Sequence, residues 1–278
     1  MRRLTPTEYP QEIENKLNEY KKRGYRIPPK SLLRTQEQIE GIKKSAAINT
    51  ALLDFITPYI KEGISTETID NLVYQFTTDH KAIPAPLNYE GFPKSVCISI
   101  NDVVCHGIPT PQETLLDGDI VNIDVSTIYE GYFSDASRMF LVGDVSEEDR
   151  KLVEVTKECL NIGIKEAQPW AQIGNIGAAI QQHAEKNGYS VVEELCGHGV
   201  GIKFHEEPEV LHFGERNTGM LIVPGMTFTI EPMINLGSHE VFMDADDGWT
   251  ICTEDGLPSA QWEHMLLITE TGNEILTY

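Results

Sequence analysis

The chain has 278 residues, of which 40% are hydrophobic and 23% are charged, a composition typical of a globular protein with a buried core rather than of a disordered chain. Its formal net charge of −21, from 43 acidic and 22 basic residues, repels the phosphates of nucleic acids. The five cysteines include no C-x-x-C pair, which argues against a disulfide framework and a zinc-thiolate module. No secretory signal and no apolar run of about 20 residues is present. We therefore expect a cytoplasmic protein that binds neither nucleic acid nor a membrane.

Residues 1–34 differ in pattern from the rest of the chain. Apolar residues recur at helical spacing from Gln11 to Arg23, and Gly24 then ends the predicted helix. We interpret this segment as an N-terminal extension to a single domain of residues 35–278. Its role is open at this point, between a clasp that packs on the domain and an arm that binds a partner.

Two helices are predicted before the first clear strands. Thr35 begins a capping box, and the long helix that follows ends before Pro58. A second helix is predicted from about Thr66 to His80. Alternating apolar residues within 95–107 then indicate two short strands joined by a turn.

The run from Gly118 to Phe140 places two acids inside apolar strands. Alternation and the turn residues at 130–131 predict a β-hairpin. Such a hairpin sets Asp124 and Asp135 on one face, with Cβ atoms roughly 5 to 8 Å apart. Two carboxylates at this spacing repel each other unless they share a proton or a cation. The pair therefore suggests a metal clamp, and the alternative is two structural acids with partners of their own.

The second half repeats the order of the first. Ser146 caps a predicted helix that runs to about Ala167, and another helix follows over 173–186. Strands are predicted within 220–235 and 249–269. Two helices followed by β structure, twice over, suggests two related halves, although no residue-level repeat is visible. A site built by both halves would lie at their junction.

Further candidate ligands stand in this second half. His198 is flanked by glycines, His205 follows seven residues later, and Glu231 and Glu263 each stand at the end of an apolar strand. Each residue alone fits a structural role, and His212 has no motif around it. Taken together, four carboxylates and one imidazole suit a pair of divalent first-row metal ions. The chain has no G-x-S-x-G motif, which disfavours a serine hydrolase.

From residue 35 onward the chain resembles the type I methionine aminopeptidases. The resemblance is carried by KSVCISINDVVCHGIP, GDIVNID, SDASRMF, CGHGVGIKFHEEP, TFTIEPM and SAQWEH. It implies an α+β pita-bread fold, in which two pseudo-symmetric halves of antiparallel sheet are covered by helices and a dimetal site lies at the centre. It also implies an enzyme that removes the initiator methionine from nascent proteins with a small second residue, by means of water activated at the metal pair.

The resemblance assigns roles to individual residues. It implies five metal ligands, which are Asp124, Asp135, His198, Glu231 and Glu263. Asp135 and Glu263 would bridge both ions, and Glu231 would also carry a proton. His205 would contact the scissile peptide, and His106 would contact the substrate near the reacting end. The methionine pocket would consist of Tyr89, Phe92, Cys97, Phe204 and Trp249.

Three positions depart from the pattern of bacterial relatives. Pro86, Phe92 and Trp262 stand where those relatives carry Cys, Tyr and Tyr. We expect these departures to alter the shape of the pocket and to leave the chemistry unchanged.

The resemblance also implies a cofactor and partners. The cofactor would be two divalent ions of cobalt, manganese, iron or zinc, among which oxygen and nitrogen ligands do not choose. The substrate would be the N-terminus of a nascent polypeptide. We also expect a monomer, and contact with the ribosome would suit an enzyme that acts on emerging chains. One alternative is an Xaa-Pro aminopeptidase or prolidase, which would share the five ligands but usually carries a large domain before the catalytic one. Another is a non-catalytic pita-bread binding protein, a class whose members have lost ligands.

Overall fold

The computed structural model describes residues 11–278 as an α+β fold of five α-helices and three antiparallel sheets. The helices are α1 (Gln11–Lys22), α2 (Gln36–Ile56), α3 (Thr66–Asp79), α4 (Glu147–Glu166) and α5 (Gly174–Lys186). The strands are β1 (Ile83–Pro84), β2 (Cys97–Ile100), β3 (Val103–Cys105), β4 (Ile120–Tyr129), β5 (Tyr132–Leu141), β6 (Ser190–Val191), β7 (Gly197–Gly199), β8 (Glu206–Val210), β9 (Thr227–Ile230), β10 (Met233–Asn235), β11 (Val241–Met243), β12 (Ile251–Thr253), β13 (Ser259–Gln261), β14 (Glu263–Ile268) and β15 (Asn273–Ile275). The ends of all five predicted helices are confirmed to within one or two residues.

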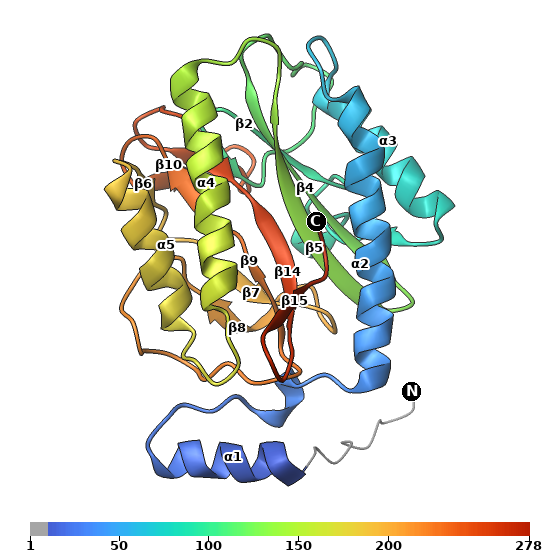
Figure 1. Ribbon diagram of the computed structural model, residues 1–278. Helices are drawn as coiled ribbons and strands as arrows, with labels where there is room; N and C mark the ends of the chain where they lie inside the picture. The colour runs from blue at the N-terminus through green and yellow to red at the C-terminus, as the bar shows by residue number, and fades with distance from the viewer. Residues whose placement is uncertain (1–10) are drawn as a thin grey trace.

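The main sheet joins the two halves of the chain. Its nine strands follow the order β1-β4-β5-β14-β9-β7-β8, with β2 beside β4 and β15 beside β14. In Figure 1, α2 and α3 lie over the half that contains β4 and β5, and α4 and α5 lie over the half that contains β9 and β14. Two smaller sheets have the orders β13-β10-β6 and β11-β12-β3. The predicted repetition is therefore present, because each half contributes strands to the main sheet and two helices that cover them.

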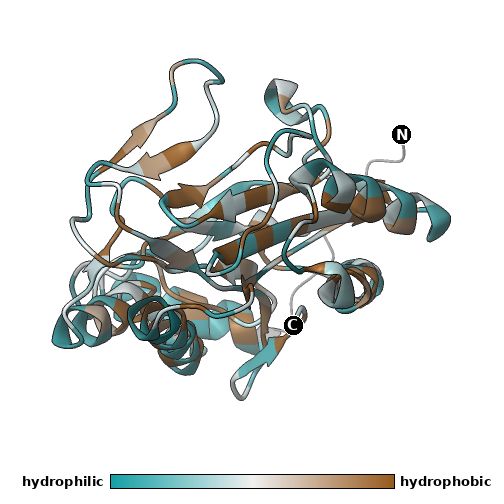
Figure 2. Ribbon diagram, turned by 90° about the horizontal axis from the view of Figure 1, so that it is seen from above, coloured by the Kyte–Doolittle hydropathy of each residue, from teal (hydrophilic) through white to brown (hydrophobic). Residues whose placement is uncertain are grey.

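Each half has its own apolar core between helices and sheet. Under α2 and α3 the largest fully buried residues include Leu53, Ile69 and Ile123, and under α4 and α5 they include Leu160 and Phe228. Figure 2 shows apolar residues concentrated in the central strands and flanking helices. In the described part of the chain, no helix combines the length and apolar character that crossing a lipid bilayer requires.

The β4–β5 hairpin forms as its sequence predicts. Glu130 and Gly131 both have positive φ, 51° and 86°, as a two-residue hairpin turn of right-handed twist requires. Ten residue pairs follow, in which Asp135 lies opposite Ser126, two positions from Asp124. The two aspartates therefore lie on one face of the hairpin, one diagonal apart, as expected.

β5 and β14 meet where the two halves join. Their ladder contains only two residue pairs, Glu263 with Ser137 and His264 with Ala136. By contrast, β14 makes four pairs with β9 in its own half. The connection between the halves within the main sheet is thus short, and Glu263 lies in it.

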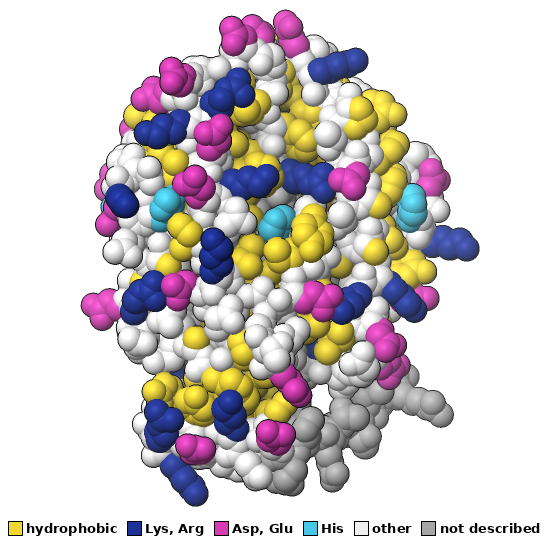
Figure 3. Space-filling view, viewed as in Figure 1, with side chains coloured by type: hydrophobic (Ala, Val, Ile, Leu, Met, Phe, Trp, Pro, Cys, Tyr) yellow, Lys and Arg dark blue, Asp and Glu magenta, His cyan; other side chains and the backbone are white. Residues whose placement is uncertain are grey.

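The described part of the N-terminal segment, residues 11–34, packs on the rest of the molecule as a clasp. Leu17 of α1 is 5% exposed within the core cluster of α4 and α5, and the Tyr20 ring stacks on Trp170 with ring centroids 5.7 Å apart. The backbone N–H of Leu221 also donates to the carbonyl of Arg26. Figure 3 shows apolar side chains along the junction of α1 with the rest of the molecule.

Candidate active site

One cavity of about 350 Å³ brings the sequence-predicted site residues together. Strands from both halves of the main sheet contribute to its walls. The predicted ligands, substrate histidines and pocket residues all line it: Tyr89, Phe92, Cys97, His106, Asp124, Asp135, His198, Phe204, His205, Glu231, Trp249 and Glu263. No predicted site residue lies elsewhere.

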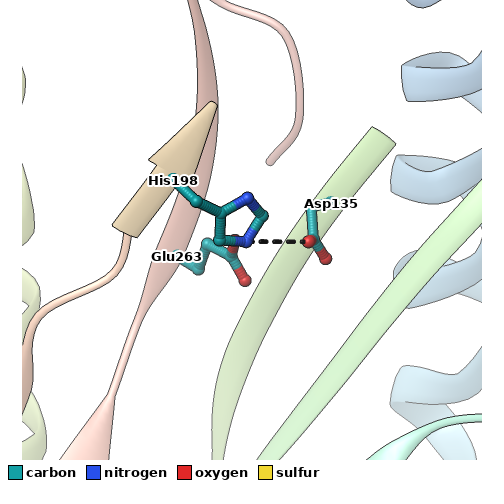
Figure 4. Close-up of side chains that lie close together, drawn as sticks. All are labelled: Asp135, His198 and Glu263. Atoms are coloured by element: carbon teal, nitrogen blue, oxygen red, sulfur yellow. Dashed lines mark ion pairs between the residues drawn. The ribbon is translucent and has the colours of Figure 1, made fainter. Parts of the chain in front are cut away.

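Three of the predicted ligands form the centre of the cavity. Asp135 on β5, His198 on β7 and Glu263 on β14 point toward one another, as Figure 4 shows, with one potential ligand atom from each within 4.8 Å of the others. His198 Nε2 lies 3.7 Å from Asp135 Oδ2 and 3.6 Å from Glu231 Oε1. These distances leave room for a cation between the groups, and Asp124 stands one diagonal from Asp135 on the same hairpin face.

Two carboxylate oxygens in the cavity have no hydrogen-bond partner. Asp124 Oδ1 and Glu263 Oε1 are both buried and unpaired. A buried acceptor without a partner costs about 1 to 3 kcal/mol, and more if it is charged. Coordination to a divalent cation would remove this cost, and four carboxylates would balance the charge of two dications. The residues present therefore fit divalent metal ions.

Neighbouring polar groups fix the orientation of the carboxylates. Ser126 Oγ donates to Asp135 Oδ1 at 2.7 Å. Thr229 Oγ1 donates to Glu231 Oε1 at 2.6 Å, and Gln261 Nε2 donates to Glu231 Oε2 at 3.2 Å. Such partners orient metal ligands and tune their basicity.

The two histidines beside Glu231 are both held by backbone groups. The carbonyl of Gly199 lies 3.0 Å from His198 Nδ1, and because a carbonyl only accepts, Nδ1 carries the proton and Nε2 offers its lone pair to a metal. His212, for which the sequence gives no signal, is fully buried, and its Nε2 accepts the backbone N–H of Glu231 at 3.1 Å. It fixes the point where Glu231 leaves β9.

Burial sets the protonation of the metal-free site. It raises the pKa of Asp124 to about 7 and that of Glu231 to about 8. Burial, together with the nearby acids, raises the pKa values of Asp135 and Glu263 well above their usual range. Burial lowers the pKa of His198 to about 3, so the imidazole is neutral and able to ligate a metal at neutral pH.

We expect the metal-free protein to lose stability as the pH rises from about 4 to about 8. The carboxyl groups of Asp124 and Glu231 have ordinary pKa values of 3.8 and 4.5 and folded values of about 7 and about 8. Below the ordinary values both states hold the protons. Between the two limits the folded state alone retains them, and ionisation then favours unfolding. Thermal unfolding across this window with a chelator, and again with saturating manganese, measures the effect; a metal-free melting temperature that does not fall more than the loaded one would contradict it.

The substrate histidines face the same cavity. His106 has a φ of 57°, a left-handed conformation that costs a non-glycine residue energy and is concentrated at functional sites. Burial lowers its pKa to about 4, and burial also lowers the pKa of His205. Tyr89 Oη lies 3.0 Å from His205 Nδ1. Both imidazoles are therefore neutral at pH 7, and that of His205 has a fixed orientation.

Aromatic rings and a thiol form the pocket beside the acids. The Tyr89 ring meets Phe204 edge to face with centroids 4.9 Å apart, and Phe92 meets Trp249 in the same way at 5.2 Å. Cys97 is buried at the base, opposite Asp124 on the neighbouring strand. Sulfur and aromatic edges attract a flexible thioether by roughly 0.3 to 1.5 kcal/mol per contact, so the pocket suits a methionine side chain.

The expected effect of Trp262 on pocket shape is wrong. Pro86 and Phe92 line the cavity, but Trp262 does not. Its Nε1 instead donates to the carbonyl of Val153 on α4 at 3.2 Å. The side chain points to the helical face because successive residues of a strand alternate between faces and Glu263, the next residue, points into the cavity.

Known proteins share both the sequence and the fold. The profile of metallopeptidase family M24 matches residues 40–270. Methionine aminopeptidase A of Synechocystis sp. is 49% identical over 245 residues, which are 88% of this chain and 96% of that protein. The crystal structure of methionine aminopeptidase from Rickettsia prowazekii has a TM-score of 0.87 and 46% identity, over 88% of this chain and 99% of that one. Prolidase from Pyrococcus furiosus shares the fold, with a TM-score of 0.70 and 24% identity, but only 65% of its chain is covered. The chain therefore belongs to metallopeptidase family M24 and, within it, to the methionine aminopeptidases.

Proposed function

We propose that the protein removes the initiator methionine from nascent polypeptides whose second residue is small, and that it works as a monomer in the cytoplasm. One observation carries the proposal: a single cavity of about 350 Å³ joins the carboxylate and imidazole cluster to a pocket of aromatic rings and a thiol. The cluster supplies hydrolytic chemistry, and the pocket supplies selectivity for a thioether side chain.

We propose that five residues hold two divalent ions, of cobalt, manganese, iron or zinc. The ligands would be Asp124, Asp135, His198, Glu231 and Glu263, all of which line the cavity. When bound, the ions would supply a water of lowered pKa and polarise the scissile carbonyl. Four carboxylates and one imidazole provide the oxygen and nitrogen atoms that all four metals accept.

The side chains around the cations would transfer protons and donate hydrogen bonds during the reaction. Glu231 takes the proton from the attacking water and passes it to the departing amine, while Thr229 and Gln261 keep its two oxygens in place. We assign the Tyr89 hydroxyl as the donor in its 3.0 Å contact with His205 Nδ1, which leaves the proton of the neutral ring on Nε2. His205 then donates from Nε2 to the negative oxygen of the tetrahedral intermediate. His106 contacts the peptide near the reacting end.

Peptide hydrolysis assays test the substrate and the metal requirement together. We expect cleavage of Met-Ala-Ser, much slower cleavage when a bulky residue replaces Ala, loss of activity with a chelator and recovery when cobalt or manganese is added. An Xaa-Pro dipeptide serves as the competing substrate. A preference for Xaa-Pro would favour the prolidase alternative, and a protein that stays inert with cobalt, manganese, iron and zinc would favour the binding protein.

Two observations weigh against these alternatives. The chain is 24% identical to the prolidase structure that it matches, whereas it is 49% identical over 245 residues to methionine aminopeptidase A of Synechocystis sp.. A non-catalytic binding protein would not need five candidate ligands beside two neutral histidines.

A protein that acts on emerging chains would gain from contact with the ribosome. Cosedimentation of the protein with ribosomes tests this contact.

A further inference from the structure

A buried ion pair lies behind the loop that carries two cavity residues. The side chain of Arg34 is 1% exposed, and its Nη2 lies 2.6 Å from Oε1 of Glu206, whose side chain is 12% exposed. Removing both charges from water costs several kcal/mol unless further hydrogen bonds satisfy them. Arg34 meets this condition, because its Nε donates to Thr227 Oγ1 at 3.0 Å and its Nη1 donates to the carbonyl of Ser31 at 3.3 Å.

The same carboxylate oxygen also organises the loop. Glu206 Oε1 accepts the backbone N–H of Ile202 at 3.1 Å and that of Lys203 at 3.4 Å. The segment between Val200 and Glu206 has no helix or strand of its own, so these bonds take the place of a ladder. Two backbone amides of the loop thus share one carboxylate oxygen, which also contacts Arg34.

Phe204 and His205 stand in this loop. Their rings lie against each other with centroids 4.3 Å apart, and the His205 ring lies 4.2 Å from that of His198. On the cavity side, His205 has its contact with the Tyr89 hydroxyl at 3.0 Å. Behind them, Glu206 holds the loop backbone at Ile202 and Lys203, and the carbonyl of Gly201 accepts the backbone N–H of Phe133 at 2.9 Å. Without Arg34, the Glu206 carboxylate would lose its cationic partner. It would then either stay buried with its charge unbalanced or turn toward water, which would break its bonds to Ile202 and Lys203. Both outcomes weaken the support of the loop.

We infer that Arg34 is a positioning residue that acts through Glu206 to hold His205 and Phe204 at the substrate. This inference rests on the proposed function. Arg34 contacts none of the five ligand side chains, and none of the ligands lies within the loop between Val200 and Glu206. Its loss therefore reduces turnover and leaves metal affinity in place. A displacement of about 1 Å of a reacting group costs up to about 10²-fold in rate, which sets the size of the effect.

The test measures kcat, KM and metal affinity for Arg34→Met, Arg34→Lys and Glu206→Gln with a methionyl peptide. We expect Arg34→Met and Glu206→Gln to lower kcat/KM by about 10- to 100-fold, with metal affinity unchanged. Arg34→Lys keeps the charge and one donor, so it recovers part of the activity. Arg216→Gln is the matched control, because Arg216 makes two hydrogen bonds to Glu166 at 3.0 and 2.9 Å on the surface; it should behave as the wild type.

A double-mutant cycle with His205→Ala separates positioning from general destabilisation. If Arg34 acts through His205, then Arg34→Met adds little to the loss that His205→Ala already causes. Fully additive losses, or wild-type activity in Arg34→Met, would overturn the inference. The wild-type assay decides the proposed function separately, because an inert wild type fails before any variant is compared. If Arg34→Met does not fold, the same cycle is run with Glu206→Gln, for which the same loss is expected, and the same outcomes decide.

Discussion

Asp135→Asn should release the metal and abolish peptide hydrolysis. The substitution keeps the shape of the side chain and an acceptor for Ser126 Oγ, which donates to Asp135 at 2.7 Å, but it removes a charge from the centre of the cluster. Loss of a group that only supports a ligand already costs about 10- to 100-fold in metal affinity, and we expect a larger loss for a ligand itself. Metal content after dialysis and turnover of a methionyl peptide measure the two effects.

The control for this variant is an acid of the same type outside the site. Asp246 is exposed on the turn between β11 and β12, so Asp246→Asn should keep full metal content and full activity. If Asp135→Asn, stripped and reloaded with metal, recovers wild-type activity, the assignment of Asp135 as a ligand is refuted.

Glu231→Gln should lower kcat by about 10²- to 10⁴-fold, the usual contribution of a positioned proton-transfer group. The amide retains an oxygen that can accept from Thr229 Oγ1, which lies 2.6 Å from Glu231 Oε1, but it cannot accept a proton from water. We also expect weaker metal binding, since one negative charge is lost. The loss of kcat should persist when the metal is saturating, because it comes from the missing proton acceptor.

Metal titration separates the two roles of Glu231. Glu240 is exposed beside β11, and Glu240→Gln serves as the matched control with wild-type kinetics. Full recovery of kcat in Glu231→Gln at high metal concentration would mean that Glu231 is a ligand only. In that case the proton would have to pass through another group in the cavity.

Local patterns were sufficient to predict the β4–β5 hairpin and its acid pair. Alternation, turn residues at Glu130 and Gly131, and a spacing of eleven residues between Asp124 and Asp135 all lie within one short stretch. The helices were predictable for the same reason, since capping residues and apolar periodicity are local. The convergence of the remaining three ligands follows only from their chemistry and from the family resemblance, because no local pattern pairs His198 with Glu263 across the sheet.

The supporting contacts had no signal in the sequence. His212 meets Glu231 across 19 residues, and Gln261 meets it across 30, so neither contact belongs to a local motif. β7 was not predicted because Gly197–Gly199 is glycine on both sides of the histidine and shows no apolar alternation. The pairing of Arg34 with Glu206 spans 172 residues. Such partners are set by tertiary packing, which a single sequence does not display.

The two-pair ladder between β5 and β14 has a consequence for assembly. Asp135 stands on β5 and Glu263 on β14, so a cation held by both would cross-link the strands beside the two residue pairs through which the main sheet joins the two halves. Metal binding and the alignment of the two halves would then occur together. A chain whose halves were misaligned would not bring Asp135 and Glu263 together, and it would therefore lack both metal and activity.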